Sequence, residues 1–223
     1  TTQWWGILGL IGWAYLINSL VFLFAKRKLV TMIGLLILFL ALQLFHKLEL
    51  LPSTNSIFSI FNTIYGGTIP AFTSAGIVAI LVYKRIANKS EYLILGTFTI
   101  IGALFIFYGI AMKPYWGISK LRGTPAWSGI CIGIGFILFS IFHYIVDIKQ
   151  NTNWAKIIGP AGTATLTCYL LPYFIYPLRT IFGLRLPDIF NTGITGLITS
   201  LFYALIVIFI TGLLEKKGIK LKL

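Results

Sequence analysis

His143 and Asp147, near the end of an apolar run, have side chains that can exchange a proton. A spacing of four places both on one face of a helix, within hydrogen-bonding reach. An imidazole paired with a carboxylate suits a general base or a proton relay. The two residues also lie within about a turn of the end of the run, where a polar pair caps a membrane span. We favour this capping interpretation, and we extend it to His46 at the end of an earlier run.

A loop with two cations, GISKLRGTPAW over residues 117–127, separates two apolar runs. Arginine presents a planar fork that binds carboxylate or phosphate, and lysine presents a point charge. Lys120 and Arg122 therefore predict either an anion site at the membrane surface or a loop whose cations reach toward lipid phosphates. The loop glycines permit tight turns, and Pro125 suits the first turn of a following helix.

The apolar run over 157–178 has the composition of a helix that lines a cavity. Pro172 and Pro177 each remove a backbone donor and free a carbonyl, which membrane proteins tolerate next to a cavity or inside the protein. With the hydroxyl of Tyr169, the run predicts a pocket wall. Its small residues predict tight packing against neighbouring helices equally well. These are Gly159, Gly162, Thr163, Ala164, Thr165 and Thr167.

The composition excludes a soluble domain. The chain has 223 residues, of which 58% are hydrophobic and 10% are charged, and most of it falls into runs long enough to cross a bilayer. The net charge of +13 does not predict nucleic-acid binding, because the cations cluster in short connections and not on one basic face. Cys131 and Cys168 lie within apolar runs, and no metal-ligand spacing is present. We expect an integral membrane protein with no metal and no nucleic-acid partner.

The predicted fold is all-α: a polytopic transmembrane helical bundle that forms one domain over residues 1–223. Alternating the connections between two sides puts twelve Lys and Arg on one side and six on the other. The positive-inside rule makes the richer side cytoplasmic, so the N-terminus lies outside and the C-terminus inside. Residues 53–66 predict a short amphipathic helix at the outer interface. The seven predicted spans cover about 4–24, 29–45, 68–83, 92–112, 126–147, 157–178 and 192–214.

Three segments resemble one family. WWGILGLIGWAYL at 4–16, ISKLRGTPAW at 118–127 and GPAGTATLTCYLLPY at 159–173 are similar to multispan membrane acyltransferases related to heparan-alpha-glucosaminide N-acetyltransferase, especially bacterial relatives. The C-terminal residues 211–223 fit the same relatives. The resemblance implies transfer of an acetyl group from acetyl-CoA, on the cytoplasmic side, to an amino sugar or other glycan outside. It also implies a bacterial inner-membrane location and, more weakly, a homodimer.

The family patterns match two groups of residues. A pattern of Ile, Asn or Ser, and Lys, followed by Thr and Ser or Pro, matches Ile118, Ser119, Lys120, Thr124 and Pro125. A pattern of Gly, small residues, Leu and Tyr matches Gly162, Thr163, Thr165, Leu166 and Tyr169. Arg122 is added on charge alone. The expected substrate- or cofactor-binding residues are Lys120, Arg122, Thr124, Trp127, Gly162, Thr163, Thr165 and Tyr169.

The sequence departs from the family in two places. Thr163 stands where many relatives carry an Asn, so a side-chain amide is missing. The family's N-terminal block, with an Asp-Val-Phe-Arg-Gly-like motif and the proposed catalytic His, has no match in residues 1–16. We therefore assign no catalytic residue, and we expect this chain to be the C-terminal part of a longer protein.

These observations favour part of a membrane-bound acetyltransferase that acts on an extracytoplasmic amino sugar or glycan. The alternative is a non-enzymatic transporter or flippase-like bundle, for which a broken helix and a cationic mouth are equally natural. A structural subunit whose polar residues only pack is a third interpretation.

Overall fold

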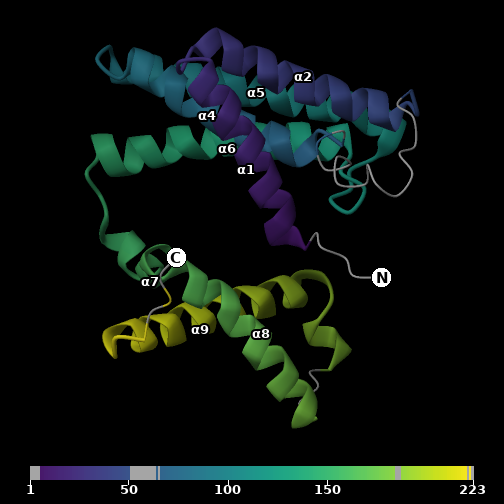
Figure 1. The fold of residues 1–223 in the computed structure, drawn as a ribbon. Helices are drawn as coiled ribbons and strands as arrows, with labels where there is room; N and C mark the ends of the chain where they lie inside the picture. The colour runs from purple at the N-terminus through teal and green to yellow at the C-terminus, as the bar shows by residue number, and fades with distance from the viewer. Residues whose placement is uncertain (1–5, 51–63, 65, 184–186, 220, 222–223) are drawn as a thin grey trace. The chain divides into compact units, whose positions relative to one another are not determined.

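The computed structural model describes the chain except residues 1–5, 51–63, 65, 184–186, 220 and 222–223 (Figure 1). The described residues form helices and connections, with no strand among them, so the predicted all-α class is confirmed. The amphipathic helix predicted over 53–66 falls almost wholly outside the described residues. The helices are α1 (Ile7–Phe24), α2 (Leu29–Lys47), α4 (Thr68–Ile86), α5 (Glu91–Trp116), α6 (Pro125–Phe142), α7 (Gly159–Thr163), α8 (Thr165–Ile181) and α9 (Gly193–Lys216).

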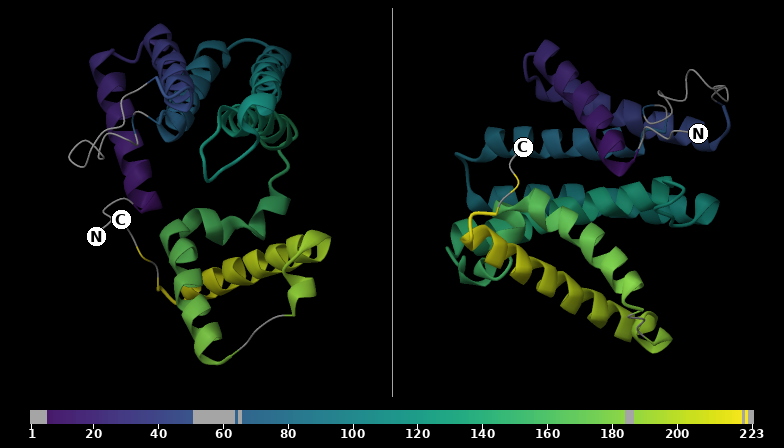
Figure 2. Two further views of the ribbon diagram at one scale, coloured as in Figure 1. Left: turned by 90° about the vertical axis from the view of Figure 1, so that its right-hand side faces the viewer. Right: turned by 60° about the horizontal axis from the view of Figure 1, so that its bottom comes forward.

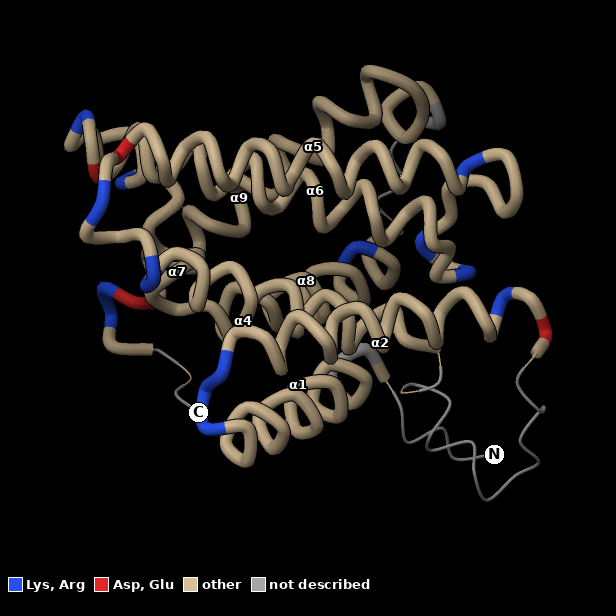
Figure 3. The backbone as a smooth tube through the Cα atoms, turned by 90° about the horizontal axis from the view of Figure 1, so that it is seen from above, with Lys and Arg blue, Asp and Glu red and all other residues tan. Residues whose placement is uncertain are grey.

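Five helices among the described residues are long and apolar enough to cross a membrane. This is the helix content of an integral membrane protein, and the predicted spans at 29–45, 68–83, 92–112, 126–147 and 192–214 each coincide with one of them. Lys and Arg gather at helix ends and in the connections (Figure 3). The count of seven spans is not confirmed, and the orientation of the termini stays a prediction. The five are α2, α4, α5, α9 and Pro125–Ile148, which joins α6 to the π-helix η2 (His143–Ile148).

The two remaining predicted spans differ from the other five. The first is the shorter apolar helix α1. The run over 157–178 is divided, because Ala164, at φ −126° and ψ 47°, ends α7 and precedes α8. Thr165 Oγ1 donates to the Gly162 carbonyl oxygen at 2.9 Å, and such a local side-chain bond competes with continuation of the helix.

The helices fall into two compact units, residues 1–149 and 150–223. Unit 1 holds α1, α2, α4, α5, α6 and η2. Unit 2 holds α7, α8 and α9 with two short 3-10 helices, η3 (Asn153–Lys156) and η4 (Asp188–Phe190). One functional domain over residues 1–223 stays a prediction.

In unit 1, α5 and α6 lie side by side along their lengths, and α4 packs against α1 and α2 (Figure 2). The core between them is apolar and aromatic. Phe98 of α5 stacks on Phe139 of α6, with ring centroids 4.4 Å apart, and Phe105 stacks on Phe136 at 6.0 Å. The buried core residues are Met32, Leu36, Phe39, Ala71, Ala75, Val78, Ile94, Phe98, Ile132 and Phe136.

Glycines form the seam between α5 and α6. A Cβ added to Gly133 would lie 2.5 Å from the carbonyl oxygen of Gly102, and one added to Gly129 would lie 3.0 Å from the Cα of Gly109. No side chain fits at these distances. The pair Gly129 and Gly133 has the spacing of the small-residue motif by which membrane helices approach closely. This seam sets α5 against α6 and therefore places the polar groups at both ends of the pair.

A buried asparagine ties α1 to α4. The Asn18 amide donates to the carbonyl oxygens of Ala14 at 2.8 Å and Pro70 at 3.2 Å. Its oxygen accepts the Ser74 hydroxyl at 2.6 Å. The amide is fully buried, and its partners leave no polar atom without a bond, as burial in an apolar bundle requires.

Candidate functional site

His143 bridges two carboxylates at one end of unit 1, which we call the histidine end (His143, Glu91 and Asp147). Its Nδ1 lies 2.7 Å from Asp147 Oδ2, and its Nε2 lies 2.7 Å from Glu91 Oε2. The sequence predicted the Asp147 pair but not Glu91, which begins α5. The imidazole is 4% exposed, whereas the Glu91 and Asp147 side chains are 54% and 58% exposed.

The surroundings of His143 fix its orientation. The ring stacks on Phe139 with centroids 6.5 Å apart, and it meets the edge of Tyr83 at 5.6 Å. His143 also begins the π-helix η2, whose wider turn shows in a hydrogen bond from the Lys149 amide to the Tyr144 carbonyl oxygen, five residues back. Single π turns inside α-helices occur frequently at functional sites.

The hydrogen bonding at the histidine end determines how many protons it holds. A neutral imidazole has one donor and one acceptor nitrogen, and ionised carboxylates only accept. Both 2.7 Å contacts are hydrogen bonds only if His143 is protonated or if one carboxyl group keeps its proton. Either arrangement gives a group of net negative charge whose proton can move along a short line. The exposed carboxylates, and not the buried ring, are the atoms that a substrate can reach.

At the opposite end of unit 1, which we call the loop end (Gln43, Thr68, Gly123 and Ser128), the buried polar groups are uncharged and hydrogen-bond to one another. Gln43 Nε2 donates to Thr68 Oγ1 at 2.7 Å and to the Gly123 carbonyl oxygen at 2.9 Å. Its Oε1 accepts the Ser128 hydroxyl at 2.8 Å. Gln43 is fully buried, and this network fastens the loop over 117–124 to α2, α4 and α6.

Two of the predicted site residues hold this loop in place. Thr124 is 1% exposed; its hydroxyl accepts the Ser119 amide at 3.0 Å and the Trp127 amide at 3.4 Å. It is the N-cap of α6, with Pro125 in the first turn as predicted. Trp127 meets Phe72 of α4 edge-to-face, with centroids 5.1 Å apart. In this structure Thr124 and Trp127 position the loop.

The two predicted cations of the loop are exposed. Arg122 Nη2 donates to the Trp116 carbonyl oxygen at 3.4 Å, and its charge acts on the nearby Lys47. Within the described part of the chain, neither Lys120 nor Arg122 forms a salt bridge with an acid. A fixed loop thus presents positive charge to its surroundings, a feature that both alternatives predicted from the sequence share.

The other predicted site residues all lie in unit 2, around the division at Ala164. Thr163 Oγ1 donates to Glu215 Oε2 of α9 at 2.8 Å. The hydroxyls of Tyr169 and Tyr173 lie 3.1 Å apart. Gly162, Thr163, Thr165 and Tyr169 are all exposed in this unit, so the chain brings them together near one helix break but does not bury them in a pocket.

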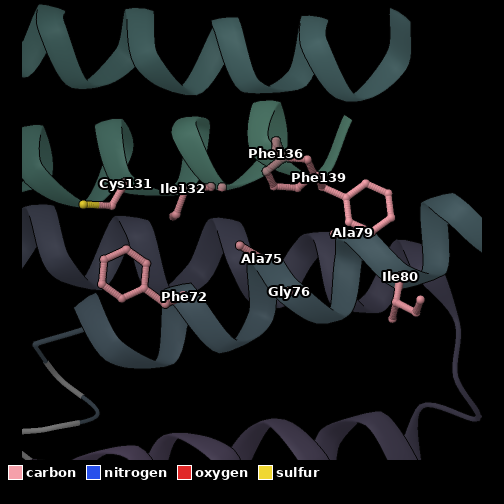
Figure 4. A pocket seen from close by; sticks show the side chains of 10 residues that line it. Phe72, Ala75, Gly76, Ala79, Ile80, Cys131, Ile132, Phe136 and Phe139 are labelled. Atoms are coloured by element: carbon pink, nitrogen blue, oxygen red, sulfur yellow. The ribbon is translucent and has the colours of Figure 1, made fainter. Parts of the chain in front are cut away.

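Each unit carries a groove. In unit 1 a groove of about 350 Å³ runs between α4 and α6 (Figure 4), lined by Phe72, Ala75, Gly76, Ala79, Ile80, Cys131, Ile132, Gly135, Phe136 and Phe139. In unit 2 a groove of about 430 Å³ is lined by residues of α8, α9 and the segment between them. Tyr176 of the predicted pocket wall lines this second groove, as does Arg179, which lies just beyond that wall; Gly162, Thr163, Thr165 and Tyr169 do not.

The histidine end is not a metal site of the usual kind. Its carboxylates bind opposite ring nitrogens, so they do not converge on one point. Among the described residues, no group of three or more His, Cys, Asp or Glu is arranged to hold a metal ion.

Sequence reasoning missed Glu91 and Gln43, for different reasons. Gln43 is a polar residue inside an apolar run, and that alone marks a candidate because such residues are costly in a membrane. Glu91 carried no such signal, since it stands in a connection where charge is ordinary.

Comparison with protein-family models, with curated proteins and with solved structures found no match to this chain. The fold and composition define an all-helical membrane protein. The resemblance to membrane acetyltransferases stays a prediction.

Proposed function

We propose that this chain is part of a membrane-bound acetyltransferase of the bacterial inner membrane, which moves an acetyl group from acetyl-CoA to an extracytoplasmic amino sugar or glycan. The observation that carries the proposal is the buried His143, hydrogen-bonded at 2.7 Å to both Glu91 and Asp147. Acetyl transfer needs a group that accepts the proton of the attacking amine or hydroxyl. The resemblance at 118–127 and 159–173 supports the same reaction class, and it suggests a homodimer.

The donor is placed at the histidine end. Tyr83 contacts His143, and Lys84 and Arg85 follow it in the last turn of α4. These cations suit the phosphates of acetyl-CoA, because lysine and arginine are the side chains that bind phosphate. The predicted topology puts this end in the cytoplasm, where acetyl-CoA is available.

The transfer step balances without a metal or a redox partner. The acceptor nitrogen or oxygen attacks the thioester carbonyl carbon, the new C–N or C–O bond forms, and the C–S bond breaks. The acceptor proton passes to a base, and coenzyme A leaves as the thiol after taking up a proton. Glu91 and Asp147 are the exposed oxygen bases of the histidine end, and His143 holds them in place and shares their proton. For the bond to form, the acceptor amine or hydroxyl must meet the thioester carbonyl at the histidine end, within reach of these carboxylates.

The experiment uses the full-length protein in liposomes, with acetyl-CoA labelled in the acetyl group and glucosamine as the acceptor. We expect labelled N-acetylglucosamine, and a rate that falls about 100-fold or more in His143→Gln, because the carboxylate bases, which contribute about that much when positioned, lose the group that holds them. His46→Gln is the matched control, because His46 is an exposed histidine at the end of α2. An absence of label on every tested sugar, or an unchanged rate in His143→Gln, would overturn the proposal.

The division of the helix at Ala164 favours transport as a second candidate function. Discontinuous helices form the substrate sites of many transporters, and α7 and α8 meet at such a break. A transporter moves glucosamine or a related solute across sealed liposomes in the absence of acetyl-CoA. Uptake of labelled glucosamine without acetylation would therefore favour transport over transfer.

A further inference from the structure

The groove of unit 1 has the shape and lining of a binding site for a hydrocarbon chain. Its lining includes the small residues Ala75, Gly76 and Gly135. The rings of Phe72, Phe136 and Phe139 also line it (Figure 4). The lining is apolar, and the groove follows two helices of membrane-spanning length, α4 and α6. Water in such a groove is unfavourable, because removing apolar surface from water lowers the free energy by about 25 cal/mol for each Å².

One end of this groove reaches the cationic loop. Phe72 lines the groove and contacts Trp127, the last residue of the GISKLRGTPAW stretch. Cys131, six residues after Pro125 at the start of α6, also lines the groove. At the other end, Phe139 lines the groove and stacks on His143. The groove therefore runs from the loop toward the histidine end.

The loop near this end of the groove carries positive charge, which favours an anion. Lys120 and Arg122 are exposed, and within the described residues they form no salt bridge with an acid. The buried Gln43 fastens the loop through the Gly123 carbonyl oxygen, so the two cations are held on a fixed backbone. A fixed lysine and arginine suit phosphate, the former as a point charge and the latter as a fork.

We propose that the groove and the loop together bind one membrane lipid that carries a phosphate headgroup. One acyl chain lies in the groove between α4 and α6, and the phosphate lies on Lys120 and Arg122. The site differs from the general attraction of surface cations to a bilayer, because it takes a single lipid in one orientation. It does not depend on the acetyltransferase proposal, since a lipid is bound here whether or not an acetyl group is transferred.

The binding test uses three probes on the full-length protein after removal of lipid in a neutral detergent. Phosphatidic acid has both the chain and the phosphate, diacylglycerol has only the chains, and inorganic phosphate has only the headgroup. Native mass spectrometry counts the probe molecules retained. We expect one phosphatidic acid per chain, bound about tenfold or more tightly than either of the other probes. The double variant Lys120→Met with Arg122→Met is expected to lower its binding to the level of diacylglycerol.

Three glycine variants test the groove itself. Gly76→Leu and Gly135→Leu add a side chain to residues that line the groove, and a Cβ at either position meets nothing within 4 Å. Gly96→Leu on α5 is the matched control, because Gly96 also has open space but does not line the groove. We expect loss of phosphatidic acid from the two groove variants and retention in the control. Equal retention in all three variants, equal binding of diacylglycerol, or equally tight binding of inorganic phosphate would overturn the proposal.

Discussion

The two ends of unit 1 satisfy their buried polar groups in opposite ways. At the loop end, a fully buried glutamine distributes its amide among neutral partners on α4, α6 and the loop. At the histidine end, a buried imidazole is shared between two half-exposed carboxylates. A closed neutral network contributes to stability and geometry, because each of its bonds replaces one to water that the bundle excludes. A charged group open to water contributes less to stability and can exchange protons.

The two ends of this bundle therefore suit different roles. The loop end holds a rigid backbone on which exposed cations are displayed. The histidine end holds a buried imidazole whose two carboxylate partners are exposed. The α5–α6 seam joins the two ends, so a change in the seam is expected to affect both of them.

The largest effect is expected from the seam that both ends share. A Cβ at Gly133 would meet the Gly102 carbonyl oxygen at 2.5 Å and Ile106 at 2.6 Å. Backbone atoms cannot move aside, so Gly133→Ala must push α5 away from α6, at a cost of about 3 kcal/mol in the free energy of unfolding. The measurement is unfolding by sodium dodecyl sulfate in bicelles, followed by tryptophan fluorescence.

Gly135→Ala on the same helix is the control for this change. A Cβ there meets nothing within 4 Å, and alanine favours helix over glycine by up to about 1 kcal/mol. The two neighbouring substitutions are thus expected to have opposite signs. Equal effects would show that the close approach of α5 and α6 does not depend on these glycines.

The second prediction concerns the loop end alone. Gln43→Leu keeps the volume but removes three hydrogen bonds, to Thr68, Gly123 and Ser128. The Gly123 carbonyl oxygen keeps a bond from Thr68 at 3.2 Å, so the cost is that of lost bonds and not of an orphaned group. At roughly 1 kcal/mol per bond, we expect a loss of about 2–3 kcal/mol. If Gln43→Leu lowers the free energy of unfolding by less than Ser128→Ala does, Gln43 is not the residue on which this network depends.

The sequence predicted the helices better than the contacts between them. Apolar length alone located α2, α4, α5 and α9 to within a few residues, because a span must cover the hydrocarbon thickness. Thr124 and Pro125 also marked the start of α6 through ordinary capping chemistry.

The contacts were harder, because these helices are apolar on all sides and their inward faces cannot be read from a periodicity. Glu91 meets His143 across 52 residues, and Gln43 meets Gly123 across 80. Both contacts depend on how each helix is rotated about its own axis. The glycine seam and the aromatic core fix that rotation. The division at Ala164 was missed for another reason: alanine is a good helix former, and the break depends on a local threonine bond.

The third prediction compares two buried serines on α6. Ser128 donates to the side chain of Gln43 at 2.8 Å, whereas Ser140 donates to the Leu95 backbone carbonyl at 3.2 Å. Ser128→Ala leaves the Gln43 oxygen without its donor, so we expect a loss of about 1–2 kcal/mol. Ser140→Ala frees the Leu95 carbonyl, which stays within helix α5, and the hydroxyl of Thr99, whose side chain is exposed, so we expect less than about 1 kcal/mol. The same bicelle assay compares the loss in free energy of unfolding for the two variants. A larger loss for Ser140→Ala would contradict the assignment of the buried hydrogen-bond network to the loop end.

The smallest effects are expected at the histidine end, where Glu91→Gln and Asp147→Asn each remove one charge and keep the shape. Both carboxylates are more than half exposed, so each pair with His143 stabilises the fold by less than about 1 kcal/mol. The two changes still differ, because Glu91 lies in the first turn of α5, where the helix dipole favours negative charge, and Asp147 lies near the end of η2, where it does not. Glu91→Gln is therefore expected to cost a few tenths of a kcal/mol more.

This difference shrinks in 1 M salt, where the Debye length falls to about 3 Å, whereas the cost of Gln43→Leu stays the same. A salt-dependent Gln43→Leu, or a salt-independent Glu91→Gln, would mean that the two ends do not differ in the way their charges and burial indicate.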